Sequence, residues 1–186
     1  MSDPAPSICC DVTVIGGGLA GKVASLHLAR AGLKVVCIEL QQPVRPPVGE
    51  SLDWSAPALL EVIGLSANSL IESRIATWKR HVTVKMRDGC DTHYVPSTWL
   101  GGFPFYVNLA TLHVERRQLD DEILKIAVDQ GVTFVRERAV DLETAGGKIC
   151  SVQTEAGKRI SSAWFIDASG VGASLIARKF NLSSLQ

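Results

Sequence analysis

Apolar and polar residues at the start of the chain follow first the period of a strand and then the period of a helix. Residues 12–15 form a short, β-branched apolar run, as expected for a buried strand of a parallel sheet. Residues 19–31 repeat apolar positions at helical spacing, and Gly32 ends this helix. A second apolar run at residues 34–38 predicts another buried strand. The pattern therefore predicts a βαβ unit.

The predicted helix has a broad apolar surface suited to packing on a sheet. Two neighbouring stripes form this surface: Ala20, Ala24, Leu28 and Ala31 on one, and Leu19, Val23 and Leu26 on the other. We expect these stripes to be the buried face of the helix.

The middle of the chain departs from this pattern. Three prolines within residues 41–48 exclude a helix there and favour an extended crossing. Residues 51–65 predict a helix, because apolar residues recur on one side of it. Residues 82–86 then alternate apolar and polar side chains, and an Asp-Gly turn at 88–89 predicts a hairpin with a second strand at 92–95.

The last third of the chain returns to the α/β pattern. Residues 116–130 form an amphipathic helix, with its apolar residues on one face, and the buried strand at 132–135 returns to the sheet in parallel register. Three further strands predict a small antiparallel meander: 140–142, 149–154 and 159–166. The fold class is therefore α/β, with a parallel sheet, a βαβ unit and a meander.

The turn between the first strand and its helix carries three spaced glycines, in the pattern G-x-G-x-x-G. Gly16 permits a sharp turn, Gly18 lets the backbone approach a pyrophosphate, and Gly21 lets the helix pack closely on the strand. The N-terminus of the helix adds free N–H groups and a partial positive charge. This turn predicts a dinucleotide diphosphate site.

The second strand ends at Glu39, about 20 residues past the glycines, where an acidic side chain accepts hydrogen bonds from a ribose hydroxyl. A 2′-phosphate would be repelled by this carboxylate. The plainer alternative is a glycine turn in an ordinary α/β protein. The coincidence of strand, glycines, helix, second strand and acid favours a nucleotide site over that alternative.

Composition narrows the class of protein. The chain has 186 residues, of which 46% are hydrophobic and 20% charged, and its net charge is zero, as in a globular protein of one domain or slightly more. It contains no basic patch typical of nucleic-acid binding and no apolar run of ~18 residues that could span a membrane. We therefore expect no nucleic-acid partner and no membrane span.

The N-terminus and the cysteines indicate a cytoplasmic setting. Residues 1–10 lack the pattern of a signal peptide and predict a short flexible arm. The five cysteines are odd in number and show no C-x-x-C spacing, which argues against a disulfide framework and a zinc site. The four histidines have no metal-ligand spacing either, so we propose no metal.

Three later segments carry a resemblance to a known family. They are Gly49-Glu50-Ser51, the helix start His113-Val114-Glu115-Arg116-Arg117-Gln118-Leu119-Asp120, and the strand end Phe165-Ile166-Asp167-Ala168-Ser169-Gly170. With the glycine turn, they resemble FAD-dependent oxidoreductases that have the glutathione-reductase-like FAD fold. The resemblance is to the group of flavin monooxygenases, flavin-dependent halogenases and geranylgeranyl-reductase-like enzymes.

The resemblance implies a Rossmann-like FAD-binding domain and assigns cofactor contacts. The diphosphate would lie at the glycine turn, the adenosine ribose at Glu39, another polar group of the cofactor at Arg116, and the adenine at the backbone of Val140. The full cofactor set is Gly16, Gly18, Leu19, Ala20, Gly21, Glu39, Arg45, Arg116, Val140 and Asp167. A cation at the opening of a helix independently suggests an anion near Arg116, although Arg117 leaves the choice open.

The resemblance also implies a domain plan. Residues 11–48 and 114–180 would form the FAD-binding domain, and residues 49–113 would be part of an inserted, β-rich substrate domain. The family places a Gly-Asp segment well after the D-A-S-G strand end, and this sequence contains no Gly-Asp dipeptide. We therefore expect the sequence to be the N-terminal part of a longer oxidoreductase, with the C-terminal remainder missing.

The implied activity is oxidation of an organic substrate by reduced flavin and O₂, as in monooxygenases and halogenases. Electrons would come from a separate flavin reductase or from NAD(P)H. Lys79 lies roughly where halogenases place their lysine, although exposed cations are common at a strand start. Five aromatic residues suggest an aromatic substrate wall, with core packing as the alternative: Trp78, Trp99, Phe103, Phe105 and Tyr106.

No catalytic residue can be assigned, since no nucleophile stands beside a base at a recognisable motif. We expect Glu50 to be structural, with its carboxylate bonding backbone N–H groups. Two other functions stay open: an FAD-dependent prenyl or lipid reductase, and a nucleotide-binding fragment without catalysis.

Overall fold

The computed structural model describes residues 7–40, 49–79, 82–94, 111–170 and 174–182. Two compact units make up the chain, and each is described by itself. The first unit combines Met1–Pro46 with Asp120–Gln186, and the second is Pro47–Leu119. That the second unit belongs to a substrate domain stays a prediction.

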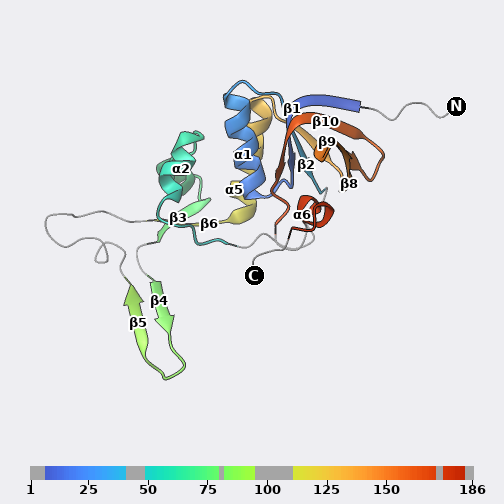
Figure 1. The fold of residues 1–186 in the computed structure, drawn as a ribbon. Helices are drawn as coiled ribbons and strands as arrows, with labels where there is room; N and C mark the ends of the chain where they lie inside the picture. The colour runs from blue at the N-terminus through green and yellow to red at the C-terminus, as the bar shows by residue number, and fades with distance from the viewer. Residues whose placement is uncertain (1–6, 41–48, 80–81, 95–110, 171–173, 183–186) are drawn as a thin grey trace, which may run out of the picture. The chain divides into compact units, whose positions relative to one another are not determined.

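The first unit is built on a six-stranded sheet (Figure 1). In spatial order its strands are β7 (Thr133–Arg136), β2 (Val35–Glu39), β1 (Ser7–Ile15), β10 (Arg159–Asp167), β9 (Lys148–Thr154) and β8 (Ala139–Ala145). The pairs β7–β2, β2–β1 and β1–β10 are parallel, whereas β10–β9 and β9–β8 are antiparallel. The predicted α/β class, parallel sheet and meander are confirmed.

Strand β10 belongs to both the meander and the parallel sheet. It pairs with β1 from Ser7 opposite Arg159 to Ile15 opposite Asp167. The flexible arm predicted for residues 1–10 is therefore wrong for residues 7–10, which are strand. The apolar run marks only the second half of β1, and the first residues of this strand are ordered by pairing with β10.

Helix α1 (Leu19–Arg30) follows the glycine turn as predicted, but its buried face differs from the predicted stripes. Four residues of the helix are buried: Gly21, Lys22, Ser25 and Leu26. By contrast, Ala20 and Ala31 are exposed. The apolar pattern was right for Leu26 and missed Lys22 and Ser25, because the face that carries Gly21 packs against the strand end and buries Lys22 with it.

The core of the first unit lies on the sheet. A cluster on it joins residues of β1, β2, β7 and the meander: Cys10, Ile15, Val36, Ile38, Val135, Leu142, Val152 and Ile160. The amphipathic helix α5 (Arg116–Asp129) is confirmed, with Leu119, Ile123 and Ala127 fully buried. A short helix, α6 (Leu175–Lys179), follows β10.

The second unit contains a two-stranded pair of β3 (Ala76–Lys79) with β6 (Thr111–Val114), together with the helices α2 (Ala56–Val62) and α3 (Ala67–Glu72). The helix predicted over residues 51–65 is wrong in extent. Ser51 instead forms an antiparallel bridge with His113. The Thr111 hydroxyl donates to the carbonyls of Leu52 and Asp53, at 3.1 and 2.6 Å, which holds this segment extended along β6.

The predicted hairpin is confirmed in the same unit. Strand β4 (Val82–Lys85) pairs with β5 (Asp91–Tyr94), and Gly89 between them has a positive φ of 82°. Among the described residues, no helix is long and apolar enough to cross a membrane.

Candidate nucleotide site

The glycine turn between β1 and α1 is tightly packed on one side. Gly16 has a φ of +105°, and a Cβ there would lie 2.5 Å from the carbonyl oxygen of Ala168. A Cβ on Gly21 would lie 1.8 Å from the carbonyl oxygen of Gly16. The predicted roles of these two glycines, a sharp turn and close helix packing, are confirmed.

Gly18, in contrast to Gly16 and Gly21, has open space beside its backbone. It is the N-cap of α1 with extended backbone, and no described atom lies within 4 Å of the position of a Cβ. The first turn of this helix contains no acidic residue. Free N–H groups and the helix dipole thus meet open space at Gly18, which is the environment that a diphosphate requires.

Gly17 is a position of close approach that the sequence pattern missed. A Cβ on Gly17 would lie 2.2 Å from Oε2 and 2.3 Å from Cβ of Glu39. The Glu39 side chain therefore lies directly against the glycine turn, where the pattern had placed a ribose-binding acid. The run of three consecutive glycines was the signal that something large approaches this backbone.

Glu39 is a largely buried carboxylate between two cations. Its side chain is 14% exposed, with Lys22 Nζ 3.8 Å from Oε2 and Arg136 Nε 3.9 Å from Oε1. Burial raises the pKa of Glu39 above its ordinary value, and the charges of Lys22 and Arg136 oppose this rise. Two acidic residues of α5 add to it: Asp120 and Asp121. Neither cation was predicted from the sequence.

Both carboxylate oxygens of Asp167, at the end of β10, accept hydrogen bonds from nearby residues of the chain. Ser169 donates its N–H and hydroxyl to Oδ1, while the Ser174 hydroxyl and the Ile176 N–H donate to Oδ2. Burial raises the pKa of Asp167, but these hydrogen bonds outweigh it and hold the pKa below its ordinary value. The carboxylate thus ties the strand end to the start of α6.

Of the other predicted contacts in the first unit, Leu19 and Ala20 open α1 beside Gly18. Arg136 is the register partner of Glu39. Val140 follows four residues later, at the start of β8, and its side chain is exposed. Its backbone contact with adenine stays a prediction. Arg45 lies outside the described residues.

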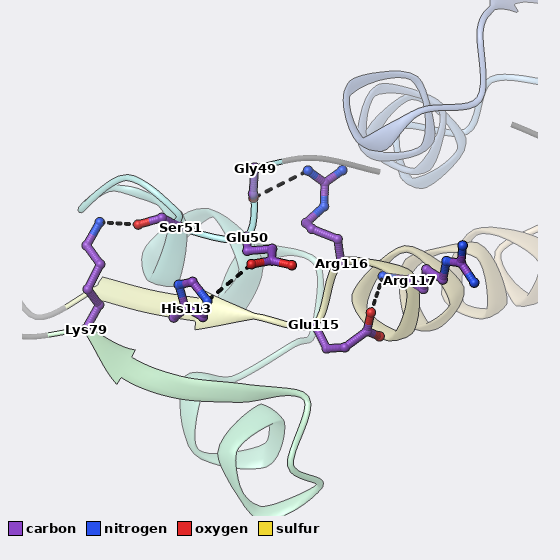
Figure 2. Close-up of polar contacts among 8 residues, drawn as sticks. All are labelled: Gly49, Glu50, Ser51, Lys79, His113, Glu115, Arg116 and Arg117. Carbon is purple, nitrogen blue, oxygen red and sulfur yellow. Dashed lines mark hydrogen bonds and ion pairs between the residues drawn. The ribbon is translucent and has the colours of Figure 1, made fainter. Parts of the chain in front are cut away.

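Arg116 lies in the second unit, within a group of polar residues around the Gly49-Glu50-Ser51 segment (Figure 2). Its Nη1 donates to the carbonyl oxygen of Gly49 at 3.4 Å. Glu115 accepts from the N–H groups of Arg117 and Gln118, which caps the start of α5. Of the two arginines, Arg116 is therefore the one whose side chain points to the Gly49-Glu50-Ser51 segment.

We expected the carboxylate of Glu50 to accept from backbone N–H groups. It pairs instead with the side chain of His113. Its Oε2 lies 3.4 Å from Nε2 of His113, and both side chains are more than half exposed (Figure 2). It is the Glu50 carbonyl that accepts a backbone bond, from the N–H of Val114 at 2.7 Å. Glu50 is thus structural mainly through its backbone.

Lys79 is held by the same segment. Its Nζ donates to Oγ of Ser51 at 2.5 Å and to the carbonyl oxygen of Leu52 at 3.4 Å (Figure 2). Neighbouring Trp78 is 40% exposed, so it is not a core residue. The remaining predicted wall aromatics lie outside the described residues: Trp99, Phe103, Phe105 and Tyr106.

Comparison with known proteins agrees with this architecture. The chain is 32% identical over 170 residues to menaquinone reductase of Mycolicibacterium smegmatis, covering 89% of this chain and 38% of that protein. It is also 32% identical over 173 residues to the flavin-dependent halogenase armH5 of Armillaria mellea, covering 86% and 32%. The structure of the flavin-dependent brominase Bmp2 matches with a TM-score of 0.73 and 27% identity, over 88% of this chain and 39% of that one.

The chain thus spans less than two fifths of the length of these relatives. The predicted relation to the flavin-dependent halogenase and reductase group is confirmed. The family model described as lycopene cyclase protein matches residues 11–183. Because this match covers almost the whole chain, the protein belongs to the lycopene cyclase protein family.

Proposed function

We propose that this chain forms the adenosine-diphosphate end of the FAD site of an oxidoreductase that acts on a small organic molecule. The observation that carries the proposal is Gly18, which leaves open space at the N-terminus of α1 while Gly16, Gly17 and Gly21 are closed by their neighbours. A site built for close packing alone would not need an open glycine at this place.

The residues of the turn fit the cofactor. The N–H groups at Gly18, Leu19 and Ala20 would hold the diphosphate, and Glu39 would accept from the ribose. Arg116 and Arg45 would contact further polar groups of FAD, and the backbone of Val140 would meet the adenine. Bound FAD would supply the electron transfer, while these residues bind and orient it.

Asp167 has a different part in this proposal. Its two carboxylate oxygens already accept hydrogen bonds from residues 169, 174 and 176. Ala168, next in the chain, donates its N–H to the carbonyl of Ile15 at 2.7 Å and packs against Gly16. We therefore propose that Asp167 shapes the diphosphate turn through Ala168 and does not contact the cofactor with its side chain.

Two reactions are proposed for the complete enzyme. One is a monooxygenase or halogenase-like reaction of reduced flavin and O₂ with a small organic substrate, a class that includes aromatic molecules, with electrons from a flavin reductase or NAD(P)H. The relative armH5, named a flavin-dependent halogenase, supports it. Lys79 would then be the lysine of halogenases, and Ser51 holds its ammonium. The five free cysteines agree with a cytoplasmic setting.

The second reaction is reduction of a lipid or prenylated substrate. A relative with the same 32% identity is named menaquinone reductase, which favours this alternative as strongly as the halogenase favours the first. Oxygen consumption by the reduced flavoprotein supports the first reaction, whereas anaerobic turnover of a quinone supports the second. Substitution Lys79→Met should abolish halogenation and leave quinone reduction unchanged.

The binding proposal is tested on residues 1–186 by titration with FAD, followed by flavin fluorescence. We expect weak but saturable binding, because this chain supplies one end of the site. Gly18→Ala should raise the dissociation constant at least about tenfold, since its Cβ fills the diphosphate space. The fold should tolerate it, since φ is −67° and no described atom is near. Absence of saturable binding, or equal affinity in the variant, would contradict the proposal.

A further inference from the structure

Lys22 is a buried cation that the nucleotide-binding pattern does not require. It follows Gly21 on the second turn of α1, and only 8% of the residue is exposed. Lysine is almost never this buried unless its charge has a partner. The burial of Lys22 therefore implies that its ammonium has an anionic partner inside the protein, near the end of β2.

The partner of Lys22 is Glu39. The ammonium lies 3.8 Å from Oε2, and the two side chains are 11% and 14% exposed. Arg136, the cation on the other oxygen, has a side chain that is 60% exposed, so water screens its charge. Lys22 is thus the cation that acts on Glu39 inside the protein.

Gly17 fixes the geometry of this pair from the other side. The Glu39 carboxylate lies where a Cβ of Gly17 would be, so the side chain is pressed against the turn that opens at Gly18. We propose that Lys22 is a positioning residue, which holds the Glu39 carboxylate ionised and oriented to accept hydrogen bonds from the adenosine ribose. The inference rests on the proposed function and deepens it.

The physical reason is the cost of burying a carboxylate. Burial raises the pKa of Glu39, and so do Asp120 and Asp121 on α5. Lys22 and Arg136 oppose this rise. Without Lys22, protonation of Glu39 becomes easier, and a protonated carboxyl is a weaker acceptor for the ribose hydroxyls.

A double-mutant cycle tests the coupling without any cofactor. Urea unfolding is measured between pH 5 and pH 8 for the wild type, Lys22→Met, Glu39→Gln and the double variant. Lys22→Met raises the folded pKa of Glu39 further, so the destabilisation by this substitution should grow as the pH rises through the folded pKa of wild-type Glu39, which already lies above the ordinary glutamate value. In the Glu39→Gln background, Lys22→Met should cost less and its cost should not depend on pH.

Equal losses on Lys22→Met in both backgrounds at every pH would overturn the inference, because Lys22 would then act only through the packing of its alkyl chain. Lys22→Arg is the matched control, because it keeps the charge and should retain the pH profile of the wild type. Wild-type titrations of other groups cancel in the cycle, because they are present in all four proteins.

FAD titration of the same variants tests the effect on the ribose. At pH 7.5, Lys22→Met should raise the dissociation constant about tenfold, which is the loss of one charge-assisted hydrogen bond. Lys22→Arg should restore most of the affinity. Wild-type affinity in Lys22→Met would overturn the inference. Absence of saturable binding in the wild type would instead refute the proposed function, and the unfolding cycle would still decide whether Lys22 positions Glu39.

Discussion

One ion pair of the first unit is buried, whereas a comparable pair of the second unit is exposed. In the first unit, the side chains of Glu39 and its partner Lys22 are 14% and 11% exposed, and a Cβ on Gly17 would lie 2.2 Å from Oε2 of Glu39. In the second unit, Glu50 and His113 form a pair whose side chains are 63% and 52% exposed. Burial makes the first pair expensive to disturb, whereas water screens the second.

The comparison separates a closely packed glycine turn from an exposed polar surface. The glycine turn has close neighbours at Gly16, Gly17 and Gly21 and open space at Gly18. The segment around Ser51 is held by hydrogen bonds from Lys79, Thr111 and Arg116. We expect substitutions in the first unit to have larger effects than chemically similar ones in the second.

The largest effect is expected for Gly21→Ala. Its Cβ would lie 1.8 Å from a backbone carbonyl oxygen, which cannot rotate away, so α1 must shift from the strand end. We expect a loss of more than about 3 kcal/mol in the free energy of unfolding, at or beyond the usual cost of overpacking. Urea denaturation measures the loss. Gly18→Ala is the matched control and should cost at most about 1 kcal/mol, the range of an N-cap change.

A smaller loss is expected for Asp167→Asn. The asparagine NH₂ that replaces Oδ2 cannot accept the bonds that Ser174 and Ile176 donate there, so about 1–3 kcal/mol should be lost at pH 7. Because the folded pKa of Asp167 is lowered, its contribution exists above the ordinary aspartate pKa and disappears as the pH falls through the folded value. Unfolding curves of the two proteins should therefore converge in acid. A gap that stays constant down to pH 2 contradicts this account.

The smallest effect is expected for Glu50→Gln in the second unit. Its exposed pair with His113 should contribute less than about 1 kcal/mol, and 1 M NaCl should remove most of that difference. Unfolding of wild type and variant in low and high salt provides the measurement. A salt-independent loss of several kcal/mol would show that the contrast between the units is false.

Local sequence patterns predicted much of the fold. The βαβ unit, the helix at residues 116–129, the hairpin at Gly89 and the antiparallel meander follow from periodicity and turn chemistry, which act over a few neighbouring residues. The same patterns predict Gly18 and Glu39 as nucleotide-binding positions, because their spacing in a βαβ unit is set by backbone geometry.

Other features depend on contacts between distant segments. Residues 7–10 are a strand only because β10 pairs with them, and Ser51 is extended only because β6 lies beside it. The buried face of α1 is another case, since Ala20 is exposed while Lys22 is buried. A polar residue of this kind gives no periodic signal of its burial, because its partner is distant in the sequence.

The sequence by itself determined that a glycine turn precedes a helix and that an acid ends the next strand. The tertiary structure decided what lies against Gly17 and which cation accompanies the acid. The positions of Gly18 and Gly21 in the glycine pattern predicted different roles for them, whereas the approach of the Glu39 side chain to Gly17 is visible only in the folded chain. Close packing is a property of neighbours in space, and the burial that pairs Lys22 with Glu39 is created when α1 meets β2.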